Sequence, residues 1–419
     1  MRSVLPSASA PARPERAPLK PLDLALAELL AFAAPLTPVE SISTFDADGR
    51  VLAHDLRSGL DVPAHDNSAM DGYAVRCADW LDAATLLQVN QRIPAGSSGH
   101  LLAPASAARI FTGAPIPPGA DAVVMQEDCD AVEGCVRLRA QPRPGQWIRQ
   151  RGEDVAAGAV VLQRGTRLSP ASLGLAASIG FDKLQVAPRV RVALFSTGDE
   201  LVMPGDVAPA DMKPGAIYNS NRFFLKALLQ RLGCIVTDLG IVPDRLDATI
   251  AALKGASEQH DLILTSGGVS VGEEDHIKPA VQALGQLNLW HLAMKPGKPF
   301  AYGKIGAAHF LGLPGNPVSG FVTFLLLVRP FILKLQGARR VAPESIALPA
   351  HFDCAKPDKR REFLRARFDA SGGLELFDNQ SSGVLTSAVW GDGLVDHPAG
   401  QTIAHGDTVR FIPFSALLS

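Results

Sequence analysis

The sequence predicts an α/β multidomain protein. We expect a central three-layer α/β domain with a mostly parallel sheet, a β-rich N-terminal module and a small C-terminal β-domain. The chain has 419 residues, which exceeds one ordinary core because a domain averages about 150 residues. Predicted strands and helices alternate over residues 189–338, whereas residues 58–154 hold short β-prone runs between Pro- and Gly-rich loops. Such alternation is typical of a parallel sheet with helices on both faces.

The N-terminal part changes in composition along its length. Residues 1–20 are rich in Pro, Ala and Arg and lack the apolar run of a secretory signal. We therefore expect a disordered tail, with an organellar presequence as the alternative. Within residues 21–57, "PLDLALAELLAFAAPL" has apolar residues at helical spacing. The runs "LLQV", "ARIF" and "AVVM" predict a small all-β module over residues 58–154.

The central part contains the predicted α/β domain. Strands are expected at "RVRVALFST", "CIVTDLGIV", "DLILTS" and "AHFLGL". Helices are expected at "NRFFLKALLQRLG", "DRLDATIAALKGASEQ", "HIKPAVQAL" and "PVSGFVTFLLLVRPFILKL". Asp244 could cap the second of these helices, and Pro317 begins the last. Further on, "SIALPAHF", "FLRARFD", "LELF" and "TVRFIPF" predict the small β-domain of residues 339–419.

Composition argues against several classes of protein. The net charge is −2, so nothing global indicates binding to nucleic acid or to an anionic membrane. The most apolar stretch, "FVTFLLLV", is shorter than the about 20 residues that span a bilayer, and we expect a buried helix. The 5 cysteines form no C-x-x-C pair, so we expect reduced thiols and neither a disulfide framework nor a zinc site. A soluble, cytoplasmic protein is expected.

Glycine-containing loops follow three of the predicted strands. They are "STGDEL" at 196–201, "TSGGVSVGEED" at 265–275 and "LPGNPVSG" at 313–320. Ligands of open α/β sheets bind beyond the carboxyl ends of the strands. Glycine lets successive backbone N–H groups converge on an anion. Loops of this kind at one sheet edge therefore predict a cradle for a phosphate-like anion.

The second loop also contains G-V-S-V-G, which fits the nucleophile elbow of serine hydrolases. An elbow places its serine directly after the strand, whereas Ser270 lies beyond the expected strand end at Ser266. The acids Glu273, Glu274 and Asp275 follow it and would oppose an oxyanion intermediate. We therefore interpret this loop as a cradle, with carboxylates positioned for Mg²⁺ or another hard cation.

Charged residues in other loops extend this interpretation. Carboxylates that surround a divalent cation can hold it against phosphate oxygens, and further loop acids are Asp71, Asp154, Glu200 and Asp244. Asp71 could instead only close an Asp-Gly turn, and Asp244 could only cap its helix. In "MKPGKPF", a Pro-Gly turn brings Lys295 and Lys298 together, either as an oxyanion site or as exposed turn lysines. Together these groups predict chemistry on a phosphorylated ligand.

With these motifs, the sequence resembles the molybdopterin molybdenumtransferase family, which includes the E domain of gephyrin and its plant counterpart. The resemblance runs from about residue 20 to the C-terminus. It rests, in order, on "DNSAMDGYAV", "RIFTGAPIPPGADAVVMQED", "IRQRGEDV", "ALFSTGDELVMPG", "IYNSN", "TSGGVSVGEEDHIK", "MKPGKPF" and "LGLPGNPVSG". Chance does not produce so many ordered blocks.

The resemblance implies a homodimer of elongated, four-domain subunits with the active site in a cleft shared between them. Residues 21–57 and 155–188 would form an elongated linking domain, and residues 189–338 the molybdopterin-binding domain. The implied reaction inserts molybdate into adenylylated molybdopterin, with divalent-cation-dependent release of AMP, and yields molybdenum cofactor. Transient contact with the molybdopterin adenylyltransferase and with cofactor acceptors would fit this role.

The resemblance also implies roles for single residues. Asp71, Asp154, Glu200 and Thr112 would be catalytic, and Asp244 and Asp275 would hold the metal ion. The residues implied in substrate binding are Gly267, Gly268, Ser270, Gly272, Pro314, Gly315, Pro317, Lys295, Lys298, Arg365 and Ser382. Without the resemblance, the basic cluster that contains Arg365 would be interpreted as a solvated strand edge.

One position departs from the family, because His291 stands where many relatives have lysine. A neutral imidazole lowers the local positive potential, so we expect molybdate affinity to strengthen below about pH 6.5. Two other functions compete with the enzyme. The retained acids argue against a non-catalytic, gephyrin-like scaffold, and the flanking β-modules argue against another phosphate-ester hydrolase on the same α/β module.

Overall fold

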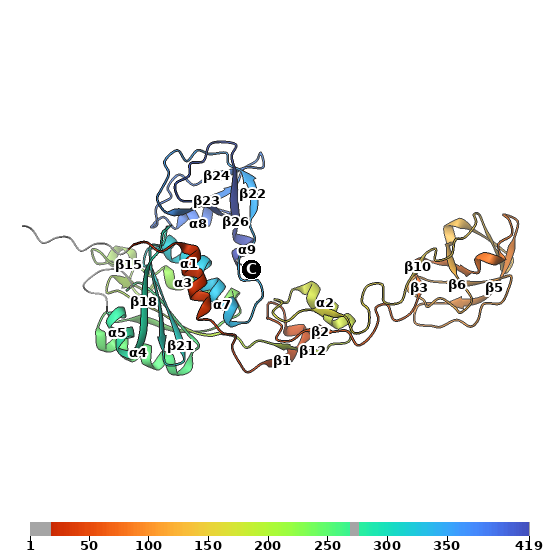
Figure 1. Ribbon diagram of the computed structural model, residues 1–419, viewed down its shortest axis with the longest axis horizontal. Helices are drawn as coiled ribbons and strands as arrows, with labels where there is room; N and C mark the ends of the chain where they lie inside the picture. Colours follow the sequence, from red (N-terminus) through yellow and green to blue (C-terminus); the bar gives the residue numbers. More distant parts are fainter. Residues whose placement is uncertain (1–17, 269–275, 419) are drawn as a thin grey trace, which may run out of the picture. The chain divides into compact units, whose positions relative to one another are not determined.

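The computed structural model describes residues 18–268 and 276–418. These residues divide into two compact units (Figure 1). Unit 1 contains the described residues up to Glu40, then 49–51, and those from Ala187 onward. Unit 2 contains residues 41–48 and 52–186.

The α/β sheet of unit 1 has the strand order β16–β13–β17–β21–β20–β18. Its strands are β13 (Arg191–Thr197), β16 (Ile235–Val242), β17 (Leu262–Ser266), β18 (Gly285–His291), β20 (Pro299–Ile305) and β21 (Ala308–Leu313). The four strands expected from the sequence run parallel to one another. In contrast, β20 and β18 extend the sheet in antiparallel orientation. The sheet is therefore mostly parallel, with an antiparallel edge that the sequence pattern did not predict.

Helices cover both faces of this sheet. Successive side chains of a strand point to opposite faces, so the two apolar cores that contain neighbouring residues of β13 lie on opposite sides of the sheet. Val192 and Leu194 belong to one apolar core with α1 (Leu22–Ala31), α3 (Asn221–Arg231) and α7 (Arg329–Leu335). Ala193 and Phe195 belong to another core with α4 (Leu246–Gln259) and α5 (Ile277–Leu284). In Figure 1, α4 and α5 accordingly lie on one side of the sheet and α1, α3 and α7 on the other. The predicted three-layer α/β architecture is confirmed.

The most apolar helix runs from Pro317 to Leu335 and passes from α6 (Pro317–Thr323) through a π-helical segment (Phe324–Val328) into α7. By length and composition alone it could cross a membrane, but 94% of its most apolar window is buried inside the protein. Its side chains fill the larger core of unit 1. This confirms the expected buried helix.

A second sheet of unit 1 has the strand order β19–β23–β25–β26–β22, and β24 pairs with β23. Its strands are β19 (Met294–Lys295), β22 (Ile346–Pro349), β23 (Arg361–Phe368), β24 (Leu374–Leu376), β25 (Gly393–His397) and β26 (Thr408–Pro413). The short strand β19 lies between β18 and β20 in the chain and pairs in parallel with β23. The loop that carries the two candidate lysines is thereby attached to the C-terminal sheet.

Unit 2 is built mainly on β-structure. Its largest sheet has the order β7–β4–β6–β5–β9–β8. The strands are β4 (Gly72–Val75), β5 (Leu86–Ile93), β6 (Ser106–Ile110), β7 (Ala122–Met125), β8 (Cys129–Val132) and β9 (Cys135–Leu138). Pairing of β2 (Leu56–Arg57) with β11 (Val160–Leu162), together with α2 (Pro170–Ser178), forms a separate small layer. The helix expected within residues 21–57 is α1, and it packs in unit 1.

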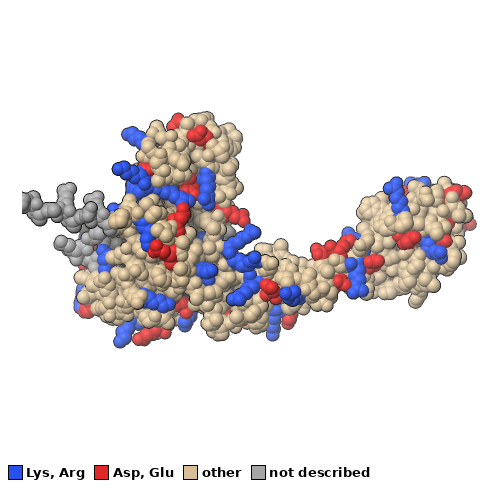
Figure 2. Space-filling model, in the orientation of Figure 1, with Lys and Arg blue, Asp and Glu red and all other residues tan. Residues whose placement is uncertain are grey.

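Charged side chains of both signs lie interspersed on the face shown in Figure 2. The chain has 40 Lys and Arg residues against 42 Asp and Glu residues. The described residues on that face therefore mix positive and negative side chains, as expected for a chain with a net charge near zero.

Candidate active site

The carboxyl ends of the parallel strands lie at one edge of the α/β sheet. In the register of the sheet, Thr197 is opposite Val242, and Ser266 is opposite both Ser196 and Leu313. The loops beyond these strands line a pocket of about 1060 Å³. Its lining includes these residues implied from the sequence: Glu200, Asp244, Gly267, Gly268, Lys295, Lys298, Pro314, Gly315, Pro317 and Ser382.

The loop after β17 brings its backbone close to neighbouring groups. Gly267 and Gly268 have φ angles of +94° and +66°. A Cβ atom on Gly268 would lie 2.5 Å from Cγ1 of Ile277 and 3.0 Å from Oγ1 of Thr197. Glycine is therefore required both by backbone conformation and by space. Ser270, Gly272 and Asp275, implied in the same loop, lie outside the described residues.

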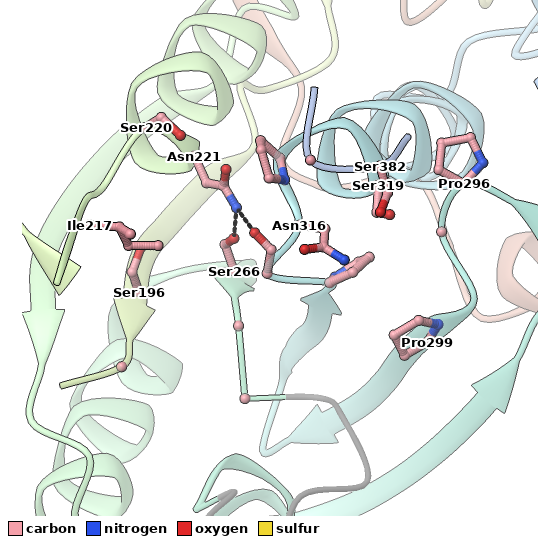
Figure 3. A pocket seen from close by; sticks show the side chains of 18 of the residues that line it. Ser196, Ile217, Ser220, Asn221, Ser266, Pro296, Pro299, Asn316, Ser319 and Ser382 are labelled. Carbon is pink, nitrogen blue, oxygen red and sulfur yellow. Dashed lines mark hydrogen bonds between the residues drawn. The ribbon is translucent and has the colours of Figure 1, made fainter. Parts of the chain in front are cut away.

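Asn221 connects two of the pocket loops. From the start of α3, its side-chain Nδ2 donates hydrogen bonds to Oγ of Ser266 (2.8 Å) and to the carbonyl oxygen of Gly315 (2.7 Å). Figure 3 shows this amide between the ends of the two loops. Asn221 is only 8% exposed, so these hydrogen bonds fix the separation of the loops. Sequence reasoning assigned Asn221 no role of its own, although it lies in the quoted block "IYNSN".

Two buried polar side-chain atoms at the pocket have no hydrogen-bond partner among the described residues. They are Oγ of Ser196 and Nδ2 of Asn219. Ser196 is 1% exposed and Asn219 is 2% exposed. Because a buried polar atom without a partner costs free energy, such atoms normally bind water or a ligand. Their position favours a polar ligand in this pocket.

Lys295 and Lys298 differ in their electrostatic surroundings. Nζ of Lys295 lies 2.7 Å from Oε1 of Glu362 and 3.5 Å from Oδ2 of Asp358. The hydrogen bond that Lys295 donates to Glu362 is the main reason that the pKa of Lys295 is raised. Lys298 is exposed and, within the described parts of the chain, forms no ion pair. Lys298 therefore offers the less compensated positive charge to an anion.

Two of the implied acids line this pocket: Asp244, implied as a metal ligand, and Glu200, implied as a catalytic residue. Helix α4 begins after Arg245, and no side chain caps it at that position. Asp244 lies one residue before that cap position. Carboxylate oxygens are ligands that Mg²⁺ prefers, so the chemistry of this donor set fits a hard divalent cation.

Arg365 lies outside the pocket lining and is 1% exposed. Its guanidinium donates hydrogen bonds to Oγ of Ser387 and to the carbonyl oxygen of Phe363, both at 3.1 Å. Burial lowers the pKa of Arg365 to about 10. The backbone N–H of Arg365 also binds Oε1 of Gln380, whose loop reaches the pocket at Ser382. Arg365 thus supports a pocket loop, and Arg360 is the arginine that lines the pocket.

Asp71, Thr112 and Asp154 belong to unit 2, whereas the pocket belongs to unit 1. Oδ1 of Asp71 accepts hydrogen bonds from the backbone N–H and from the hydroxyl of Thr112, both at 2.8 Å. Both hydrogen bonds lower the pKa of Asp71, and the one from the backbone N–H has the larger effect. Asp71 and Thr112 are both exposed, as is Asp154 beside the pairing of Val155 with Val62. The structure thus brings Asp71 and Thr112 into hydrogen-bond contact.

Comparison with known proteins agrees with this arrangement. Family models match at residues 20–180 (MoeA N-terminal region, domain I and II), 193–334 (probable molybdopterin binding domain) and 347–414 (MoeA C-terminal region, domain IV). A molybdopterin molybdenumtransferase of Haemophilus influenzae is 40% identical over 95% of this chain and 99% of its own length. The chain belongs to the MoeA family.

Other MoeA-family relatives support the same assignment. Molybdopterin molybdenumtransferase 2 of Mycobacterium tuberculosis is 37% identical over 89% of this chain and 93% of its own length. The crystal structure of a molybdopterin biosynthesis MoeA protein from Pyrococcus horikoshii OT3 aligns with a TM-score of 0.83 at 28% identity. That alignment covers 94% of this chain and 100% of the other. The resemblance stated from the sequence is confirmed.

In this MoeA-family chain, His291 ends β18 and is half-buried. Burial, followed by the charges of Lys298 and Lys278, lowers the pKa of His291 below 6.5. Protonation is disfavoured because the positive charge would be partly desolvated and would lie near other cations. If protonation of His291 strengthens molybdate binding, we therefore expect this effect at a lower pH than the value of about 6.5 expected from the sequence.

Proposed function

We propose that this MoeA-family protein is a molybdopterin molybdenumtransferase, which inserts molybdate into adenylylated molybdopterin and releases AMP. The observation that carries the proposal is the pocket at the strand ends. It combines a glycine backbone, carboxylates and lysines at one site. The curated relatives that match nearly the whole chain have the same name.

Backbone N–H groups and a divalent cation would together stabilise the negative charge of the adenylate. N–H groups of the loop at Gly267 and Gly268 would bind phosphate oxygens. Asp244, together with Asp275, would hold Mg²⁺ or another divalent cation, and Glu200 of the same pocket would act in catalysis. A bound cation would neutralise charge on the phosphate oxygens as the adenylate is cleaved. Asn221 would keep the loops that hold the phosphate at a fixed separation, because it binds both of them.

Molybdate would bind as a substrate beside the lysine turn. Lys298 supplies a positive charge with no ion pair among the described residues, whereas Glu362 holds Lys295 in place. Arg360 and Ser382 line the same pocket and could donate hydrogen bonds to the oxyanion. The phosphate and molybdate subsites would therefore use different residues of one pocket.

A homodimer would give Asp71, Thr112 and Asp154 a catalytic role. We infer that unit 2 of one subunit presents these residues to the pocket of its partner, as in the shared cleft that the family resemblance implies. The division of the implied residues between two units supports this arrangement. We further propose a cytoplasmic location and transient contact with the molybdopterin adenylyltransferase and with cofactor acceptors.

A direct assay tests the proposed reaction. Purified protein is incubated with adenylylated molybdopterin, Mg²⁺ and molybdate, and both AMP and metallated cofactor are measured. We expect both products in equal amounts and neither product when Mg²⁺ is omitted. A non-catalytic scaffold would yield neither product under any condition, and a simple phosphate-ester hydrolase would release AMP without metallating the cofactor.

A further inference from the structure

Three side chains of the C-terminal sheet place metal-binding atoms close together outside the pocket lining. Cys354, Glu362 and His397 each offer one such atom, and these atoms lie within 4.8 Å of one another. Nδ1 of His397 is 3.9 Å from Sγ of Cys354 and 3.7 Å from Oε2 of Glu362. In tetrahedral zinc sites, bond lengths of about 2.0–2.3 Å place ligand atoms about 3.3–3.8 Å apart. Small side-chain movements would therefore complete this geometry.

The backbone holds these side chains in place. Glu362 on β23 and His397 on β25 lie directly opposite each other in the antiparallel register. Cys354 is fixed by two backbone hydrogen bonds with Ile403, of 2.7 Å and 3.1 Å. Binding sites built on paired strands are more precise than sites on free loops. Little ordering would be needed for an ion to bind.

The imidazole of His397 is oriented as in a metal site. Its Nε2 lies 3.0 Å from the carbonyl oxygen of Gln401. A carbonyl oxygen can only accept a hydrogen bond, so Nε2 carries the proton and donates it. In the neutral ring, the lone pair of Nδ1 then faces Cys354 and Glu362. Metal-binding histidines usually donate their second N–H to a carbonyl or carboxylate in this way.

The charges of the cluster suit a divalent cation. A Cys354 thiolate and the Glu362 carboxylate would supply two negative charges, and neutral His397 none. Oε1 of Glu362 already binds Lys295, which leaves Oε2 on the side of His397. The charge of Lys295 is shared with Asp358 at 3.5 Å. Sulfur and nitrogen ligands favour Zn²⁺ over Mg²⁺ or Ca²⁺.

We propose that Cys354, Glu362 and His397 bind Zn²⁺ or a divalent cation of similar ligand preference, with a fourth position for water. The sequence predicted no zinc site, because these ligands come from three separate segments without metal-binding spacing. Glu362 also anchors the pocket residue Lys295. The ion would thus connect the C-terminal sheet to the lysine turn, and the proposal does not depend on the reaction assigned to the pocket.

Metal titration of the full-length protein tests the proposal. After treatment with a chelator, the protein is titrated with Zn²⁺ against a chromophoric competitor and, separately, with Co²⁺. We expect one Zn²⁺ per chain, a higher melting temperature with Zn²⁺, and a sulfur-to-cobalt charge-transfer band. Cys354→Ala should lose that band and bind Zn²⁺ at least about 100-fold more weakly, because loss of a direct ligand exceeds loss of an outer partner.

A matched variant locates the ion. Cys135→Ala alters another half-buried cysteine, in unit 2. This variant should bind Zn²⁺ like the unaltered protein. Unchanged binding in a folded Cys354→Ala variant would overturn the proposal. So would the absence of Zn²⁺ and Co²⁺ binding at micromolar concentrations in the unaltered protein, since the three side chains would then only pack against one another.

Discussion

At the scale of single residues, the two lysines of the pocket turn have separate tasks. Glu362 has a side chain that is 7% exposed, and Lys295 is its nearest cation. Loss of one partner leaves a buried charge uncompensated, which costs more than loss of an exposed charge. The side chain of Lys295 is 44% exposed, so solvent screens part of this effect.

We therefore expect Lys295→Ala to lower the free energy of unfolding by about 1–3 kcal/mol. Lys298→Ala, the matched control in the same turn, should change it by less than about 0.5 kcal/mol. Urea denaturation of both variants measures the difference. Equal losses of stability would show that Glu362 does not depend on Lys295.

Asp71 offers a second test at this scale. Thr112→Val removes the hydroxyl bond to the carboxylate but keeps the backbone N–H bond, which is the larger cause of the lowered pKa. The pKa of Asp71 should therefore rise only part of the way toward 3.8. A lowered pKa in the folded state adds stability above the unfolded value, and this contribution is lost as pH falls through the folded value. The wild-type protein should thus lose it in the acid range below pH 3.8.

NMR titration of the Asp71 carboxyl group in both proteins measures this change. Asp71→Asn identifies the resonance. A pKa that stays unchanged in Thr112→Val would contradict a contribution from the hydroxyl.

At the scale of elements, the sequence predicted the features that follow from a repeating pattern. It did not predict contacts between residues that lie far apart in the sequence. The parallel strands and their helices follow from alternating patterns, and the pocket loops from their glycines. The strands β18 and β20 were missed because an antiparallel edge needs no helical crossover. Asn221 and Glu362 were missed because their partners, Gly315 and Lys295, lie far away in the sequence.

The lysine turn depends on Gly297, which has a φ of +111°. A Cβ atom there would overlap with Oγ1 of Thr323, whereas Gly306, with a φ of +56°, has open space around it. Both glycines adopt positive φ, so Gly306→Ala controls for backbone strain alone. We expect Gly297→Ala to weaken molybdate binding and to lower the melting temperature more than Gly306→Ala does. Calorimetry of both variants decides this, and equal effects would contradict a steric role for Thr323.

At the scale of the whole molecule, the implied catalytic residues are divided between the two units. If the active site is shared between the subunits of a dimer, an Asp71→Asn subunit and an Asp244→Asn subunit can form one intact site. An equimolar mixture of the two variants should then recover about a quarter of wild-type activity, because about half of the dimers are mixed and each mixed dimer has one intact site of two. Each variant alone should be nearly inactive. Absence of recovery in isolated mixed dimers would place all the residues of a site in one subunit.

The central claim is that one pocket holds separate subsites for molybdate and for the cation-bound adenylate. The most direct measurement is the rate of cofactor metallation as a function of molybdate concentration in Lys298→Ala and in Asp244→Asn. Loss of one charge-assisted hydrogen bond of about 1.5–3 kcal/mol should raise the molybdate requirement of Lys298→Ala about 10- to 100-fold. High molybdate should therefore restore Lys298→Ala, whereas Asp244→Asn should stay inactive. Restoration of both variants, or of neither, would contradict separate subsites.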